Sequence, residues 1–448
     1  MPSSSGSESD PLNALVVDGQ DGHIHQDSIN TNDKKDRTPL PWRQLLIVYT
    51  IQFAEPITGC IIYPFINQFV RETGITRGDE RSTGYFAGLI ESTFFISEAL
   101  TVVFWGMASD RFGRRPILVL GPLGLAVGMI GFGMSTQFWL LVAFRCLQGT
   151  FNGNIGVSKT VMGELTDKTN IADAFALMPV MWSIGTTLAP ILGGLLSQPA
   201  IRWPETLGKI TYLKNHPYFL PCFAAAMIAF LTYLGALVGL QETLPSAILR
   251  KKQRHLQSSP SPSTNLSVDN DVPNYGSNGA TFRQNGPPPD LDDVMAKTER
   301  PPTPREILTR DVLSILINYG LLAFCDMSIQ VLIPLMWSTS PEHGGLGFTP
   351  YMIGTTMGTF GVINAFIQIT CLGAVIRYFG PRNVYIFGFS SYLVALSSLL
   401  LQVYFSRQVG GADWRVWIAI IVQLSMQSIN YATYGNFRII SDRLGTLT

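Results

Sequence analysis

The 448-residue sequence predicts an all-α membrane protein, and three observations support this fold class. Hydrophobic residues make up 46% of the chain and charged residues 14%, whereas soluble domains carry roughly 25% charged residues. Apolar runs of about 20 residues, the length that a helix needs to cross a bilayer, recur from residue 45 almost to the end. Two of these runs are separated by a short loop, residues 106–116, that contains four charges.

Residues 1–41 are predicted to form a disordered cytoplasmic tail. They are rich in Ser, Asp, Asn and Gly and lack the apolar core of a cleaved signal peptide. The tail holds one histidine pair, His23 and His25, which is far short of a metal site. The five cysteines fall singly in apolar runs without metal-ligand or disulfide spacing. We expect no bound metal and no cofactor.

Residues 42–244 are predicted to form an N-terminal membrane half. Its apolar runs predict six transmembrane helices, near residues 45–69, 84–105, 117–135, 138–160, 173–196 and 218–240. With no signal peptide, the first of these helices must direct membrane insertion.

Residues 245–310 change character, with Ser-Pro repeats and proline-rich runs. Such a segment cannot bury enough apolar surface to order itself, so it is predicted to be a disordered cytoplasmic linker. Residues 311–448 then predict four further helices, near residues 312–336, 350–375, 384–405 and 414–436. We therefore expect about ten helices, six before the linker and four after it.

The basic residues predict a cytoplasmic amino terminus, because loops rich in Lys and Arg face the cytoplasm. Opposite loops are poorer in these residues or offset them with acids, and residues 337–349 contain neither Lys nor Arg. The loop 198–217 weakens the rule locally without reversing it. The predicted cytoplasmic residues include Lys34, Lys35, Arg37, Arg111, Arg114, Arg115, Lys159, Lys168, Arg377 and Arg382.

The loop 106–116 has the pattern G-x-x-x-D-R-x-G-R-R-P. Its glycines, Gly106 and Gly113, are expected to let the backbone turn sharply. The pattern resembles the loop between the second and third helices of the major facilitator superfamily of secondary transporters. A weaker echo at residues 373–382 repeats the spacing in the second half, as expected for parallel internal repeats. The gating-loop residues are Gly106, Asp110, Arg111, Gly113, Arg114 and Arg115.

The resemblance implies a twelve-helix fold that works by alternating access, in which Asp110 meets the positive amino end of the eleventh helix. Only residues 437–448 follow the last predicted helix, and another crossing needs about 20 residues. We therefore expect the last two helices to be missing, through an incomplete gene model or an altered splice product. An alternative is a truncated, non-transporting membrane protein of the same fold.

Arg145 stands within an otherwise apolar run. A charge at membrane depth is costly and faces a cavity or a partner, and the sequence around it resembles the family's fourth-helix motif, R-x-L-x-G, whose arginine is associated with proton coupling. The alternative is that Arg145 lies near a helix end and extends to the interface.

The fifth predicted helix resembles the family's antiporter motif, G-x-x-x-G-P-x-x-G-G, with alanine in place of one glycine. Small residues allow a neighbouring helix to approach closely, and a proline favours a kink. The resemblance favours exchange of substrate for protons; the alternative is an ordinary tight helix contact. The matching residues are Gly185, Ala189, Pro190, Gly193 and Gly194.

Four buried carboxylates are predicted proton carriers, because burial raises the pKa of a carboxyl towards the working range. In order of preference they are Glu55, Asp326, and then Glu91 and Glu98, which share roughly one helix face. The alternative for each is a hydrogen bond to a neighbouring helix. Predicted substrate contacts are the polar or aromatic residues at membrane depth: Gln52, Asn152, Asn154, Trp182, Asn318, Gln330, Asn364 and Gln368.

The segments 53–56, 104–106, 151–154 and 163–164 are similar to those of the fungal and plant drug/proton antiporters that include the zinc-induced-facilitator-like proteins. The likeness implies proton-driven multidrug or small-molecule efflux across the plasma or vacuolar membrane. We expect protons, a small-molecule substrate and the lipid bilayer as partners, no nucleic acid, and a monomer. An enzyme is not expected, since the sequence has no P-loop, paired-histidine motif or Ser/His/Asp set.

Overall fold

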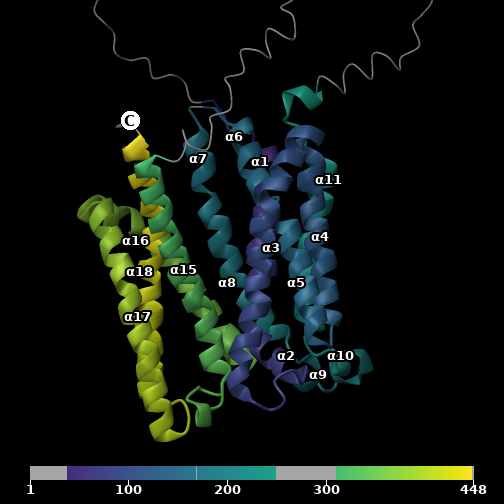
Figure 1. The fold of residues 1–448 in the computed structure, drawn as a ribbon, viewed down its shortest axis with the longest axis vertical. Helices are drawn as coiled ribbons and strands as arrows, with labels where there is room; N and C mark the ends of the chain where they lie inside the picture. The colour runs from purple at the N-terminus through teal and green to yellow at the C-terminus, as the bar shows by residue number, and fades with distance from the viewer. Residues whose placement is uncertain (1–37, 168, 249–308, 446–448) are drawn as a thin grey trace, which may run out of the picture. The chain divides into compact units, whose positions relative to one another are not determined.

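The structure is a computed structural model that describes residues 38–167, 169–248 and 309–445. Within these ranges the regular elements are all helical, and the helices from α1 onward belong to one structural unit (Figure 1). Helices satisfy their own backbone hydrogen bonds, which a segment inside a bilayer must do. The predicted linker and tail, with His23 and His25, lie almost entirely outside the described residues.

Every apolar run predicted in the first half coincides with helix. The run 45–69 is divided into two helices, and the runs 138–160 and 173–196 are also interrupted. The helices within the predicted runs are α1 (Trp42–Cys60), α2 (Ile66–Glu72), α3 (Thr83–Phe112), α4 (Arg114–Met134), α5 (Phe138–Asn152), α6 (Ile155–Leu165), α7 (Ile171–Ala176), α8 (Met178–Leu196) and α11 (Phe219–Gly239). Short elements in the loops are η1 (Glu80–Ser82), α9 (Pro199–Arg202), η2 (Leu207–Lys209) and α10 (Thr211–Asn215).

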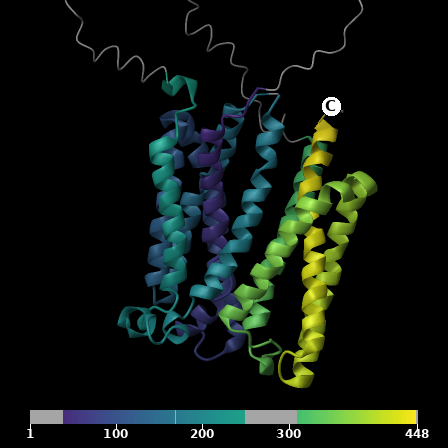
Figure 2. The same ribbon diagram turned by 180° about the vertical axis from the view of Figure 1, so that it is seen from behind.

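The second half consists of four long helices and one short turn. They are α15 (Arg310–Ser338), η3 (Pro341–His343), α16 (Pro350–Phe379), α17 (Pro381–Val409) and α18 (Trp414–Gly445). Figure 2 shows them from behind, in green to yellow, beside α8 of the first half. In the described part of the chain, six helices are long and apolar enough to cross a membrane on length and composition.

One glycine with positive φ joins two long helices in each half. Gly113 separates α3 from α4 with φ 107°, and Gly380 separates α16 from α17 with φ 78°. A residue with a side chain rarely adopts such a φ, whereas glycine does so freely. The predicted sharp turn at Gly113 is confirmed, and the weak sequence echo has a structural counterpart at Gly380. The prediction for Gly106 is wrong, because α3 continues without a turn to Phe112.

Buried apolar side chains form cores within each half. One first-half cluster includes Phe65, Phe132 and Tyr218, and the largest second-half cluster includes Trp337 and Tyr392. The partly buried Met357 of α16 packs against both clusters. The two halves are therefore in direct apolar contact along α16.

Candidate transport site

One membrane helix of the first half is broken between α5 and α6. Helix α5 ends at Asn152 and α6 begins at Ile155, so the predicted run 138–160 is not one continuous helix. Next to the break, the Thr150 carbonyl accepts hydrogen bonds from Trp105 Nε1 at 2.6 Å and Thr101 Oγ1 at 3.2 Å. Side chains of α3 thus hold the end of α5, as a polar backbone inside a bilayer requires.

Glu55 faces this break from α1. Its Oε1 accepts a hydrogen bond of 3.1 Å from Asn152 Nδ2. The next residue, Pro56, has no N–H and therefore cannot bond the Gln52 carbonyl one turn earlier. Glu98 of α3 lies within electrostatic reach of Glu55 and also interacts with the Asn152 amide. Asn152 therefore lies between two carboxylates, where α1 lacks one backbone hydrogen bond at Pro56 and α5 ends before α6 begins.

Two further polar groups lie next to these carboxylates. Gln52 Nε2 donates to Ser158 Oγ on α6 at 3.1 Å, and Lys159 exerts an electrostatic influence on both Glu55 and Glu98. The predicted residues Gln52, Glu55, Glu98 and Asn152 thus come together from α1, α3 and α5. Lys159 was predicted only as a cytoplasmic loop residue.

Arg145 and Glu91 form a separate buried ion pair. Arg145 Nη2 lies 2.6 Å from Glu91 Oε2, and the Arg145 side chain is 0% exposed. Gln148 Oε1 accepts from Arg145 Nη1 at 2.9 Å, and Tyr63 donates to Glu91 Oε1 at 3.1 Å. The Phe94 ring lies 4.8 Å from the guanidinium carbon, which adds a cation–π contact.

This geometry contradicts the alternative that Arg145 extends to the interface. It also divides Glu91 from Glu98, which were predicted to share one helix face: Glu91 pairs with Arg145, whereas Glu98 approaches Glu55 and Asn152. The sequence prediction missed Tyr63 and Gln148. Gln148 stands one helical turn after Arg145 within the quoted motif, and this spacing was the signal that could have identified it.

The fourth predicted carboxylate is buried in the second half. Asp326 of α15 is 5% exposed and accepts hydrogen bonds from Gln330 Nε2 at 2.9 Å and Tyr392 Oη at 3.4 Å. On α16, Gln368 Nε2 donates to Asn364 Oδ1 at 3.3 Å. The predicted Asp326 and Gln330 are therefore direct partners, and Tyr392 is an addition from the structure.

Three other predicted contact residues lie apart from these clusters. Asn154 is buried, and its Nδ2 lies 3.4 Å from the Ile117 carbonyl of α4. Asn318 is exposed and donates to the Ser314 carbonyl in its own helix. Trp182 of α8 is 37% exposed. None of the three has a described contact with Glu55, Glu91 or Asp326.

The predicted gating loop forms a charged network at the α3–α4 turn. Arg114 Nη1 lies 2.6 Å from Asp110 Oδ1, and Arg114 Nη2 lies 3.0 Å from Glu164 Oε1. The Glu242 carboxylate accepts from the backbone N–H groups of Arg114 and Arg115, at 2.7 and 3.1 Å. A carboxylate at a helix amino end satisfies unpaired N–H groups and the positive dipole end. Glu164 and Glu242 thus fix the start of α4.

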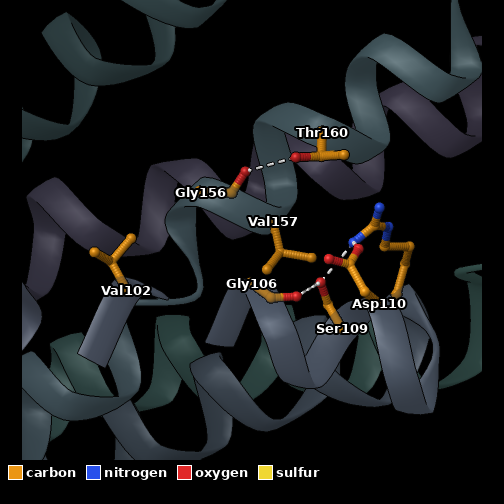
Figure 3. Close-up of a pocket in the computed structure, with 8 residues that line it drawn as sticks. Val102, Gly106, Ser109, Asp110, Gly156, Val157 and Thr160 are labelled. Atoms are coloured by element: carbon orange, nitrogen blue, oxygen red, sulfur yellow. Dashed lines mark hydrogen bonds and ion pairs between the residues drawn. The ribbon is translucent and has the colours of Figure 1, made fainter. Parts of the chain in front are cut away.

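Asp110 itself is open to its surroundings, with 67% of its side chain exposed. Figure 3 shows Ser109 and Asp110 beside a cavity of about 300 Å³, with Gly156, Val157 and Thr160 of α6 across it. Arg111 is exposed and lies over the ring of Phe112. The loop residues therefore divide into a fixed part at Arg114 and an accessible part at Asp110 and Arg111.

The antiporter-like motif packs against two helices. A Cβ on Gly185 would lie 2.4 Å from Pro56 Cγ, and one on Gly193 would lie 2.1 Å from the Ile61 carbonyl oxygen, both beside α1. A Cβ on Gly194 would lie 2.8 Å from Gly354 Cα on α16. Ala189 and Pro190 are also buried. The motif thus has no room for larger side chains on either face and forms part of the seam between the halves.

No cluster of three or more metal-ligating side chains occurs among the described residues. The chemistry available here is that of buried carboxylates, one ion pair and amides at interrupted helices. Such groups at membrane depth are typical of membrane transporters.

Comparison with known proteins identifies the family. Residues 48–439 match the Major Facilitator Superfamily. The chain is 31% identical over 383 residues to the major facilitator-type transporter psiT2 of Psilocybe cyanescens, a match that covers 85% of this chain and 72% of that one. The chain belongs to the Major Facilitator Superfamily, and its relatives include proteins named as multidrug transporters.

One of these is the multidrug transporter mfsB of Aspergillus fumigatus, 28% identical over 83% of this chain and 70% of that one. Protein ZINC INDUCED FACILITATOR 1 of Arabidopsis thaliana is 28% identical over 78% of this chain and 67% of that one. Among solved structures, the human organic anion transporter MFSD10 matches 89% of this chain and 86% of that one with a TM-score of 0.52 at 18% identity. This likeness confirms the fold class.

Proposed function

We propose that this protein exports a small molecule or drug in exchange for protons by alternating access. The observation that carries the proposal is the position of Glu55, a carboxylate beside Pro56 in α1 that is hydrogen-bonded to Asn152 at the α5–α6 break. A carboxylate at membrane depth can release and take up a proton as its surroundings change. The name of the multidrug transporter mfsB supports drug-like substrates, and the name of the efflux pump azaK of Aspergillus niger supports export.

In this proposal, Glu55 and Glu98 carry protons in the first half and Asp326 is a second acidic site. Protonation of Glu55 removes the charge that its contact with Asn152 stabilises, and this change frees Asn152 to bind substrate. The Arg145–Glu91 pair holds α5 to α3 while the carboxylates change charge. Gln52 and Gln330 provide further hydrogen bonds for the substrate.

The proposal also includes the organisation and placement of the protein. The membrane halves are residues 42–244 and 311–448, joined by the linker 245–310. The tail 1–41 and the linker face the cytoplasm, and the protein acts as a monomer in the plasma or vacuolar membrane. The basic loops support this orientation.

The test uses the purified protein in vesicles with an imposed pH gradient and a fluorescent drug inside or outside. We expect drug flux that follows the gradient and collapses when a protonophore is added. Glu55→Gln should abolish the gradient dependence, whereas Glu205→Gln, at a side chain that is 91% exposed, should leave it unchanged. Flux that ignores the gradient, or no flux from folded protein, would reject the proposal.

A further inference from the structure

Three polar contacts join the two halves at one end of the bundle. We call the end that carries α2, α9 and α10 the distal end (Figure 1). Each contact links a different segment of the first half to a different segment of the second. Together they involve Arg71, Glu80 and Arg202 on one side and Ser338, Ser340 and Tyr351 on the other, which we call the distal clasp.

The first contact uses a free helix end. Arg71 Nη2 of α2 donates a hydrogen bond of 3.1 Å to the Ser338 carbonyl, the last residue of α15. The final carbonyls of a helix have no partner within it, so a cation placed there satisfies one of them and the negative dipole end.

The second contact is centred on Glu80 of η1. Its Oε2 accepts from Ser340 Oγ at 2.8 Å and from the Ser340 N–H at 3.4 Å. His343 Nδ1 lies 3.5 Å from the same oxygen. One carboxylate oxygen thus faces Ser340 and His343, two residues of the loop between α15 and α16. Hydrogen bonds to a charged acceptor are stronger than those between neutral groups.

The third contact is a cation–π pair. The Arg202 guanidinium carbon of α9 lies 3.8 Å from the centre of the Tyr351 ring at the start of α16. Arg202 belongs to the loop 198–217, whose basic residues run against the charge rule for loops facing away from the cytoplasm. The contact with Tyr351 gives this arginine a physical role at its position.

The clasp lies next to the seam between α8 and α16, where the two halves are in close contact. The two backbones approach closely at Gly194 of α8 and Gly354 of α16, where an added Cβ on Gly354 would lie 2.4 Å from the Pro190 carbonyl. The seam continues along both helices to Thr187 and Gly361. For the distal ends of α8 and α16 to separate, the clasp must break as well.

We propose that the distal clasp holds the distal side of the transporter closed and sets how often that side opens. The inference rests on the proposed alternating access, since a closed distal side has a function only in a protein that opens it. Arg71, Glu80, Arg202, Ser340 and Tyr351 then act as positioning residues: they control access and do not bind the substrate.

The test measures opening directly. Met357 packs against the cores of both halves, so a cysteine at this position is shielded while the distal side is closed. In a background with the five native cysteines replaced, the labelling rate of Met357→Cys by a maleimide is measured in permeabilised vesicles. Orientation, substrate and proton gradient therefore do not affect the readout.

We expect Tyr351→Leu to raise the labelling rate about two- to fivefold, which is the change in the closed-to-open equilibrium that loss of an exposed cation–π contact would produce. Ser340→Ala should raise it about tenfold, because it removes a hydrogen bond to a charged group. The two effects should multiply, since the contacts share no residue. Tyr351→Phe keeps the ring and is the matched control, expected to label like the parent.

Unchanged labelling in Ser340→Ala and Tyr351→Leu, with each variant monodisperse, would overturn the clasp. Equal increases in the labelling rate of Tyr351→Phe and Tyr351→Leu would show that the cation–π pair is not part of the clasp. Labelling needs no transport, so the two proposals can fail separately. Faster labelling of the variants, in a protein that shows no drug flux, would retain the clasp and reject the proposed export. Normal drug flux with unchanged labelling of the variants would retain the proposed export and reject the clasp.

Discussion

Removal of the Glu91 carboxylate should destabilise the first half more than any other single polar change there. Arg145 is 0% exposed, and Glu91 is its one acidic partner among the described ion pairs, at 2.6 Å. After Glu91→Leu, the guanidinium keeps the Gln148 amide oxygen at 2.9 Å, the Gly59 carbonyl at 3.4 Å and the Phe94 ring, none of which carries a negative charge. A buried cation would then remain without a counter-charge.

The expected loss is about 3–5 kcal/mol of unfolding free energy, the cost of breaking a buried ion pair by removal of one partner. Replacing both partners by apolar residues is often neutral or stabilising. The double variant Glu91→Leu/Arg145→Leu should therefore recover most of the stability that Glu91→Leu loses. The recovery is the signature of a buried charge and not of lost packing volume.

The measurement is unfolding by SDS in mixed micelles, followed by tryptophan fluorescence. Glu205→Leu, at a side chain that is 91% exposed, serves as the control and should change the unfolding free energy by less than about 0.5 kcal/mol. If the double variant is as unstable as Glu91→Leu alone, the uncompensated Arg145 charge is not the cause and the reasoning fails.

Three other predictions follow from single contacts. Gly354→Leu should prevent close packing with Gly194, because even a Cβ at this position meets backbone atoms of α8, and should therefore raise the maleimide labelling rate of Met357→Cys. The control Gly320→Leu, where an added Cβ meets nothing within 4 Å, should leave that rate unchanged. Glu242→Gln should lower the unfolding free energy by about 0.5–2 kcal/mol through weaker capping of α4, measured in the same micelles. The largest single influence on Glu80 is burial, which raises its pKa. The hydrogen bonds from Ser340 and the positive charges of Arg71 and His343 together outweigh burial, so the Glu80 pKa lies below its ordinary 4.5. The distal contact should therefore be intact above pH 4.5 and weaken as the pH falls through the lowered pKa; labelling in Glu80→Gln should lack this acid step.

The sequence was sufficient for the positions of the long helices, because a bilayer demands about 20 apolar residues for each crossing. Each predicted run contains helix, from α1 to α18. The interruptions were not predicted, since Asn152, Gly153 and Asn154 leave the apolar pattern almost unchanged. The apolar run of helix α3 was expected to end near residue 105, because charged residues follow, but the helix continues to Phe112. Its charged last turn lies outside the apolar run, where water and the ion pairs of Arg114 can hydrogen-bond the charged side chains.

The sequence predicted which charged residues are buried better than it predicted which residues they contact. The sequence identified Glu55, Glu91, Glu98 and Arg145 as buried charges, but a single helix cannot reveal which neighbouring helix each one faces. Glu242 was missed for the same reason: it follows α11 in the sequence and caps α4, 128 residues away from Arg114. Contacts between distant segments depend on packing that no local pattern contains.

The two halves bury titratable groups in different proportions, since Asp326 is the one buried carboxylate described in the second half, and this difference bears on how protonation moves them. The first half has an ion pair at Arg145 and two neighbouring carboxylates, whose charges change with proton binding. In the second half, Trp337 Nε1 donates to Gln402 Oε1 at 3.1 Å and Gln402 Nε2 donates to Gln423 Oε1 at 2.6 Å. Amides and indoles keep the same charge throughout the physiological pH range. We therefore expect changes in proton occupancy to alter packing mainly around α1 and the α5–α6 break. In the second half we expect them to act only near Asp326 and Tyr392, while the amide network of α15, α17 and α18 moves as a unit.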